Sequence, residues 1–267
     1  MLTRRDWLRT TAAAGAAVTL NPDILLALKR QEMMTRAIPS TGEQLPIVGL
    51  GSSATFQRVA RGDDVTQLRN VLSALVENGG TVFDTAPSYG TSEEVAGRLA
   101  SELEITDRIF WATQVNVARR GPADAAAARA QIEASFGYFG VDEIELMQVH
   151  NLGDLPTQMP IIQELKAEGR IRYIGTTLTP RGPQYQGLMQ AMRDYPLDFI
   201  GVDYAVDETD AADEVLPLAQ ERGIGVLVYL PFGRSRLWNR VGDREVPDWA
   251  REFGANSWAQ FFIKFAA

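Results

Sequence analysis

The feature that most constrains the fold is a regular alternation of short apolar runs with longer amphipathic stretches. The apolar runs cover residues 47–51, 81–86, 109–115, 144–150, 171–177, 198–204 and 225–231. From residue 81 onward their first residues (81, 109, 144, 171, 198, 225) lie 28, 35, 27, 27 and 27 residues apart. Stretches with helical spacing fill the intervals, at residues 65–77, 93–103, 123–136, 159–167, 185–192 and 213–222. This repeat predicts β–α units joined into one parallel sheet.

Seven such units favour an α/β fold of the (β/α)8 TIM-barrel type over an open doubly wound sheet. The open nucleotide-binding fold needs a G-x-G-x-x-G turn after a strand, and neither that pattern nor a phosphate-binding P-loop occurs in the sequence. After the seventh run the chain has only a loop and a helical stretch at residues 256–267. We therefore expect a barrel domain over residues 37–267 without an eighth strand or a C-terminal tail, because the chain is truncated or because the barrel is incomplete.

The first 36 residues have the pattern of an export signal. Two adjacent arginines, Arg4 and Arg5, precede Trp7, Leu8 and an apolar run at residues 12–20. This order predicts a twin-arginine signal. The run is far shorter than the ~20 residues that a membrane-spanning helix needs. We expect residues 1–36 to engage the twin-arginine export machinery and to direct the domain to the periplasm or another extracytoplasmic space. The alternative is a basic amphipathic N-terminal helix.

Composition excludes several kinds of partner and site. The chain has 26 Lys and Arg against 34 Asp and Glu, a net charge of −8, which argues against nucleic acid or an anionic membrane as partner. It has no cysteine and a single histidine, His150. Thiol nucleophiles, thiolate metal sites and multi-histidine metal sites are therefore excluded, and we expect no metal centre. Carboxylates, hydroxyls, one imidazole or a borrowed cofactor remain as sources of chemistry.

Functional side chains of a parallel barrel gather at the C-terminal ends of its strands. Three successive predicted strands end near Asp84, Gln114 and His150, and Tyr89 follows Asp84 by five residues. Taken singly, each residue has an ordinary structural role, since such an Asp often caps a helix and a lone His or Tyr often packs in a core. Together they predict side chains that converge on one pocket.

Several segments of the sequence resemble the aldo/keto reductase family and occur in the order of that family. They are LPIVGLG (residues 45–51), FDTAPSYG (83–90), LMQVH (146–150), GRIRYIG (169–175) and YLPFG (229–233). The resemblance covers roughly residues 40–265. It implies a (β/α)8 barrel that reduces a carbonyl group with NAD(P)H and needs neither metal nor flavin.

The resemblance also implies a role for each matching residue. Tyr89 would protonate the substrate oxygen, His150 would orient the carbonyl by a hydrogen bond, and Asp84 would support the acid. Tyr229 would stack on the nicotinamide ring of NADPH or NADH. The substrate would be a small aldehyde or ketone. The positions implied to contact the cofactor are Gly51, Ser52, Thr177, Tyr229, Pro231 and Gly233.

Three positions depart from the family pattern. Gln114 stands where the resemblance implies a lysine that assists the tyrosine, Thr177 and Leu178 replace a Ser-Asn pair, and Gly201 replaces a glutamine. A unit charge at ~4 Å is worth ~1 to 4 kcal/mol. Its loss, together with an unneutralised Asp84, should raise the pKa of Tyr89 by ~1 to 3 from its usual value near ~10.

These departures leave three functions open. The first is an exported reductase that is slow or takes an unusual substrate, with Tyr89 as its proton donor. The second is a catalytically impaired binding or regulatory module that kept the barrel. The third is a lyase or isomerase that uses Tyr89 or His150 without hydride transfer. The intact set of Asp84, Tyr89 and His150 favours the reductase.

Overall fold

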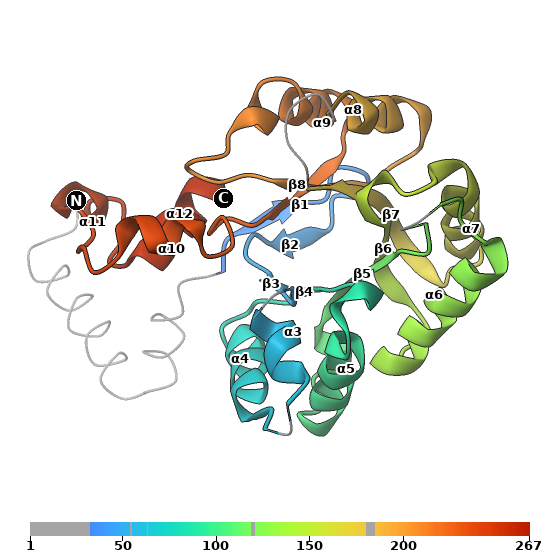
Figure 1. Cartoon of the computed structure of the whole chain (residues 1–267), viewed down its shortest axis with the longest axis horizontal. Coiled ribbons are helices and arrows are strands. Elements are labelled where there is room, and N and C mark those ends of the chain that lie inside the picture. The colour runs from blue at the N-terminus through green and yellow to red at the C-terminus, as the bar shows by residue number, and fades with distance from the viewer. Residues whose placement is uncertain (1–32, 54, 63, 119–120, 180–184) are drawn as a thin grey trace, which may run out of the picture. The chain divides into compact units, whose positions relative to one another are not determined.

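The structure is a computed structural model of the chain and describes residues 33–53, 55–62, 64–118, 121–179 and 185–267. Among these residues, seven parallel strands form one sheet in chain order, from β3 to β9. Figure 1 shows the sheet curled, with helices on its outer face. The strands are β3 (Leu50–Gly51), β4 (Val82–Asp84), β5 (Phe110–Val115), β6 (Ile144–Val149), β7 (Ile171–Leu178), β8 (Phe199–Asp203) and β9 (Gly225–Tyr229). The predicted α/β barrel is confirmed, and no eighth strand pairs with β9 in the described ranges.

The six predicted helices alternate with these strands. They are α4 (Thr66–Glu77), α5 (Ser92–Glu102), α6 (Ala125–Phe139), α7 (Leu155–Ala167), α8 (Tyr185–Asp194) and α9 (Val215–Arg222). Local chemistry sets their ends. In α6 the Asp124 carboxylate accepts from the Ala127 amide at 2.8 Å, and Gly140 ends the helix in a left-handed conformation. Helix α7 begins at residue 155 instead of 159, because Pro156 occupies the first turn, where no amide donor is needed.

Several elements lie outside the predicted alternation. An antiparallel hairpin, β1 (Thr35–Ala37) and β2 (Gln44–Pro46), precedes the barrel. Short helices follow β3 and β9, namely α3 (Thr55–Ala60), α10 (Arg236–Val241) and α11 (Asp248–Arg251). The predicted C-terminal helical stretch is α12 (Trp258–Ala266), whose Phe262 packs with Leu237 of α10 in a small separate core.

The predicted export signal falls mainly on residues 1–32, which lie outside the described ranges, so it stays a prediction. Within those ranges, none of the helices has both the length and the apolar character to cross a bilayer.

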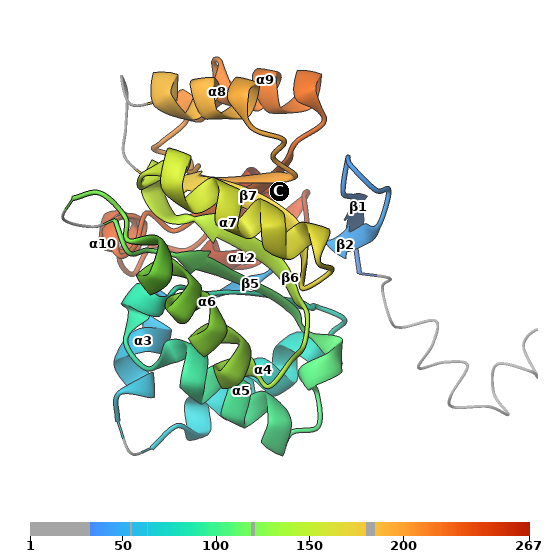
Figure 2. The same ribbon diagram turned by 90° about the vertical axis from the view of Figure 1, so that its right-hand side faces the viewer.

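Successive side chains of a strand point to opposite faces of the sheet, and this alternation separates two cores. Outward-facing residues such as Phe83, Trp111 and Met147 pack beneath the helices in the main apolar cluster. Inward-facing residues near the N-terminal ends of the strands form a second cluster, which Ile38 joins from the hairpin. Figure 2 shows the hairpin at one end of the barrel. The inward residues of this cluster are Val82, Phe110, Ala112, Leu146, Tyr173 and Phe199.

The inward face changes character toward the C-terminal ends of the strands. Two to four residues beyond the apolar cluster, each strand from β4 to β9 places a polar residue or a glycine on the same face. These residues are Asp84, Gln114, Gln148, Thr177, Gly201 and Tyr229. Along the inside of the barrel, apolar side chains therefore gather at one end and polar side chains at the other, the end at which barrels place their sites.

Candidate active site

A hydrogen bond between Asp84 and Tyr229 crosses the interior of the barrel. The Tyr229 hydroxyl donates to Asp84 Oδ1 at 3.0 Å and accepts from Gln148 Nε2 at 3.0 Å. Gln148 is fully buried on β6, and its Oε1 has no hydrogen-bond partner among the described residues. Tyr229 as a whole residue is partly exposed, and the stacking of its ring on a nicotinamide stays a prediction.

Gly201 admits the Tyr229 ring to this position. A Cβ atom built on Gly201 would lie 2.4 Å from Tyr229 Cε2 and 2.8 Å from its hydroxyl oxygen. Carbon atoms in contact pack at about 3.5–4.0 Å. Any residue other than glycine at position 201 would therefore displace the ring from Asp84.

Burial dominates the electrostatics of the two acids. Burial raises the pKa of Asp84 from 3.8 to about 7, and the hydrogen bond from Tyr229 opposes this rise. Burial also raises the pKa of Tyr89 to about 12; the negative charges of Asp84 and Asp203 add to the effect, and the positive charge of Arg234 opposes it. The predicted direction for Tyr89 is therefore confirmed, although burial is a larger cause than the neighbouring charges.

His150 follows β6, in a short 3-10 turn at residues 150–152, and its ring faces Tyr89. The two rings lie edge to face with centroids 6.4 Å apart. Asn116 Nδ2 donates to His150 Nδ1 at 2.6 Å. In the neutral ring this contact corresponds to the tautomer that has Nδ1 as the acceptor and its proton on Nε2.

Gln114 is buried and bonded to the barrel wall. Its Nε2 donates to the Thr85 carbonyl at 3.4 Å, and its Oε1 accepts from the Thr177 hydroxyl at 3.3 Å. The Thr177 oxygen in turn accepts from the Asn151 amide at 2.9 Å. Gln114 thus tethers β5 to β4 and β7, and Thr177 already both donates and accepts a hydrogen bond within the protein.

The other predicted cofactor residues lie on the segments that follow β3 and β9. Ser52 is buried, donates through its hydroxyl to Thr85 Oγ1 at 2.7 Å and through its amide to the Asp84 carbonyl at 2.9 Å. Gly51 is exposed, with no atom within 4 Å of a Cβ position. Pro231 is partly exposed, and Gly233 is buried in a turn in which its amide donates to the Leu230 carbonyl at 2.7 Å.

Three residues near the site, Gln148, Asn116 and Arg234, are not among those predicted from the sequence. Gln148 and Asn116 each lie two positions from a predicted site residue, so alternation along the strand could have placed them on the same face. Arg234, in the turn after β9, is exposed and forms no ion pair with the described residues, yet its charge acts on Tyr89. No signal in the sequence distinguishes it from other surface arginines.

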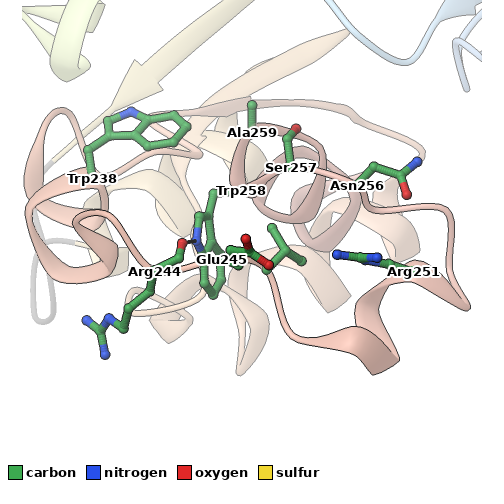
Figure 3. A pocket seen from close by; sticks show the side chains of 9 residues that line it. Trp238, Arg244, Glu245, Arg251, Asn256, Ser257, Trp258 and Ala259 are labelled. Carbon is green, nitrogen blue, oxygen red and sulfur yellow. Dashed lines mark hydrogen bonds between the residues drawn. The ribbon is translucent and has the colours of Figure 1, made fainter.

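A hollow of about 490 Å³ lies in the C-terminal helical segment (Figure 3). None of the predicted site residues lines it, and within it Trp258 Nε1 donates to the Arg244 carbonyl at 2.7 Å. Across the described part of the chain, no group of three or more Asp, Glu or His side chains is placed to hold a metal ion. The polar side chains at the C-terminal ends of the strands form the candidate site, because they include the predicted residues Asp84, Gln114 and His150.

Comparison with known proteins agrees with this geometry. The sequence profile of the aldo/keto reductase family matches residues 48–260. The aldo-keto reductase str7 of Strobilurus tenacellus is 28% identical over 228 residues, which are 83% of this chain and 64% of that protein. This chain thus spans less than two thirds of the length of str7.

Two solved structures share the fold. The glycerol dehydrogenase of Gluconobacter oxydans superposes with a TM-score of 0.63 at 25% identity, over 80% of this chain and 68% of that one. The aldo/keto reductase of Klebsiella pneumoniae, solved with NADP and acetate, superposes with a TM-score of 0.58 at 25% identity, over 76% of this chain and 74% of that one. The profile match covers the barrel strands and the candidate site, and the chain belongs to the aldo/keto reductase family.

Proposed function

We propose that this chain reduces the carbonyl group of an aldehyde or ketone with NADPH as the hydride donor. The observation that carries the proposal is the facing pair of Tyr89 and His150 rings, with centroids 6.4 Å apart, beside Asp84 at the C-terminal ends of the strands. A phenol and an imidazole N–H facing one point are suited to protonate and orient a carbonyl oxygen. The Klebsiella relative was solved with NADP, which supports the choice of cofactor.

The residues at the C-terminal ends of the strands suit a nicotinamide cofactor. The ring of Tyr229, a partly exposed residue, would stack on the nicotinamide, and the open backbone of Gly51 leaves room for a ligand. Arg234, which is exposed and makes no ion pair with the described residues, suits a phosphate group. When bound, NADPH would supply the hydride.

The chain's own side chains handle the proton. His150 Nε2–H donates a hydrogen bond to the carbonyl oxygen and fixes its orientation, while Tyr89 donates its proton to the same oxygen. A pKa of about 12 makes Tyr89 a weaker acid than a free tyrosine. A pKa difference of one corresponds to ~1.4 kcal/mol, so the rise of the Tyr89 pKa from about 10 to about 12 slows proton transfer by at most ~100-fold.

A Tyr89→Phe variant tests this mechanism. We expect the full chain to oxidise NADPH with at least one member of a panel of aldehydes and ketones, followed by the loss of nicotinamide absorbance. Tyr89→Phe should lower that rate ~100-fold or more. Tyr138→Phe removes a hydroxyl from the exposed face of α6 and should leave the rate unchanged. A Tyr89→Phe rate equal to that of the wild type would overturn the mechanism.

A second candidate is a barrel that binds ligand without turnover. It is favoured by the raised pKa of Tyr89 and by the hydrogen bonds that hold Gln114 and Thr177 within the barrel wall. In this case NADPH would bind saturably, yet no carbonyl compound in the panel would oxidise it. A rate that disappears in Tyr89→Phe excludes this candidate.

We also propose that residues 1–36 form a twin-arginine signal and that the domain acts outside the cytoplasm. The support is the Arg4-Arg5 pair ahead of the apolar run at residues 12–20. Replacement of both arginines by lysine should abolish export of the full chain from a bacterial host, measured by cell fractionation. Arg30→Lys, a matched change outside the pair, should not. Unchanged export of the double variant would refute the signal.

A further inference from the structure

Asp84 is a carboxyl group in the barrel interior whose hydrogen-bond partner is a phenol. No lysine or arginine of the described residues forms an ion pair with it, and the Tyr229 hydroxyl at 3.0 Å is its side-chain partner. A second hydrogen bond, from Gln148 Nε2 at 3.0 Å, fixes the direction of that hydroxyl. Because Gln148 Nε2 is a donor, the phenol must use its own hydrogen toward Asp84.

The position of this phenol depends on a glycine on the neighbouring strand. Asp203 and Tyr229 are paired residues of β8 and β9, and Gly201 lies two residues before Asp203 on the same inward face. The Tyr229 ring fills the space that a side chain at position 201 would occupy, since a Cβ there would lie 2.4–2.8 Å from two ring carbons and the hydroxyl oxygen. The Tyr229 ring can therefore occupy this position only because residue 201 is a glycine.

We propose that Tyr229 is a positioning residue for Asp84, that Gly201 makes room for it, and that the protonation of Asp84 sets the acidity of Tyr89. This inference rests on the proposed reductase function, because it assigns to Tyr89 the role of proton donor. In this proposal Tyr229 acts through Asp84, to which its hydroxyl donates, and makes no contact of its own with the reacting carbonyl.

The charges around the two acids give the direction of the effect. Asp84 accepts from the neutral Tyr229 hydroxyl, which itself accepts from Gln148. The charges that act on Tyr89 are those of Asp84, Asp203 and Arg234, and the His150 ring lies edge to face with it. Ionised Asp84 repels the phenolate form of Tyr89 and weakens it as an acid, whereas neutral Asp84 does not. Turnover should therefore fall as the pH rises through the pKa of Asp84.

The hydroxyl of Tyr229 stabilises the ionised form of Asp84 by donating to it. A Tyr229→Phe variant keeps the ring and removes this hydrogen bond, so the pKa of Asp84 should rise. Gly201→Ala keeps the hydroxyl but displaces the whole ring, so it should also break the hydrogen bond and raise the pKa of Asp84. Tyr138→Phe, on the exposed face of α6, is the matched control and should leave it unchanged.

The primary test is independent of any cofactor or substrate. In the full chain labelled with ¹³C-aspartate, the Asp84 carboxyl signal is identified by its absence in Asp84→Asn and titrated by NMR. We expect a midpoint near 7 in the wild type and a higher midpoint in Tyr229→Phe. An ordinary midpoint near 3.8, or the same midpoint in both proteins, would overturn the inference. Because Tyr229→Phe keeps the ring, its result stands even when Gly201→Ala does not fold.

The second test separates this inference from the proposed function. When the chain oxidises NADPH, the alkaline decline of kcat should follow the Asp84 midpoint and shift upward in Tyr229→Phe. A decline that does not move with the NMR midpoint contradicts control of Tyr89 by Asp84, although the reductase itself would stand. A chain that shows the NMR shift but no turnover with any carbonyl contradicts the proposed function and, with it, the assignment to Tyr89.

Discussion

Alanine at position 201 is a minimal change with a large expected effect. The added Cβ would lie 2.4 Å from Tyr229 Cε2 and 2.8 Å from the hydroxyl oxygen. Because non-bonded carbon atoms pack at about 3.5–4.0 Å, the ring must move by roughly 1 Å. Both hydrogen bonds of the hydroxyl, now 3.0 Å long, would then lengthen beyond a useful distance.

Three contributions set the change in the free energy of unfolding: two lower it and one raises it. Overpacking of a well-filled interior costs about 1–3 kcal/mol. The loss of the hydrogen bond to a carboxyl group costs about 1–3 kcal/mol. Replacement of glycine restricts the unfolded chain and contributes about 0.4–1 kcal/mol in the opposite direction. We therefore expect Gly201→Ala to lower the free energy of unfolding by about 2–5 kcal/mol.

Urea denaturation followed by tryptophan fluorescence measures this change. Gly137→Ala in α6 is a matched control, since nothing lies within 4 Å of its Cβ position, and it should stabilise the protein by about 0.5–1 kcal/mol. In a Tyr229→Leu background the cost of Gly201→Ala should fall by about 2 kcal/mol, because the clashing ring is gone. Equal costs in the two backgrounds, or a Gly201→Ala protein as stable as the control, would refute the proposed pairing of residues 201 and 229.

Three further predictions concern the polar side chains Asp84, Glu93 and Asn116. The pKa of Asp84 rises from 3.8 to about 7 on folding, so its contribution to stability is full below pH 3.8 and is lost as the pH rises through about 7, a change of up to ~4 kcal/mol. Asp84→Asn should remove this pH dependence of the free energy of unfolding, measured by urea denaturation at several pH values. An unchanged slope of that free energy against pH would contradict the prediction. Burial also raises the pKa of Glu93, so Glu93→Gln should stabilise the protein above neutral pH, whereas the exposed Glu94→Gln should not; equal denaturation midpoints for the two variants would argue against this. Asn116→Leu removes the donor to His150 Nδ1 and should lower turnover about 10-fold, equivalent to ~1.4 kcal/mol. Because the chain has one histidine, ¹⁵N NMR reads its tautomers directly, and an unchanged tautomer ratio would count against the assignment.

The strand and helix order could be predicted because each β–α unit has its own apolar pattern. Strands β5, β6 and β9 lie within their predicted ranges, since a buried parallel strand is a continuous apolar run bounded by turn residues. The hairpin of β1 and β2 could not be predicted in the same way. Its strands have three residues each and are largely exposed, and the hairpin depends on the packing of Ile38 against the barrel interior.

The positions of the candidate site residues at the strand ends could be predicted from the sequence, but the hydrogen bonds between them could not. The positions of Asp84, Gln114 and His150 follow from the rule that strand ends carry function. The bond from Tyr229 to Asp84 joins residues 145 positions apart and depends on the absence of a side chain at Gly201. Gln114 was expected near the acid, and its amide instead bonds to Thr85 and Thr177. A side chain with two donors and an acceptor has many partners, and only the folded barrel selects among them.

The central claim is that Tyr89 protonates a carbonyl that NADPH reduces. Its most direct test is a calorimetric titration of NADPH into the wild-type full chain and into Tyr89→Phe, followed by turnover measurements with the carbonyl panel. We expect saturable binding with a micromolar Kd in both proteins and oxidation of NADPH by the wild type alone. Absence of binding, or equal turnover in the two proteins, would contradict the claim.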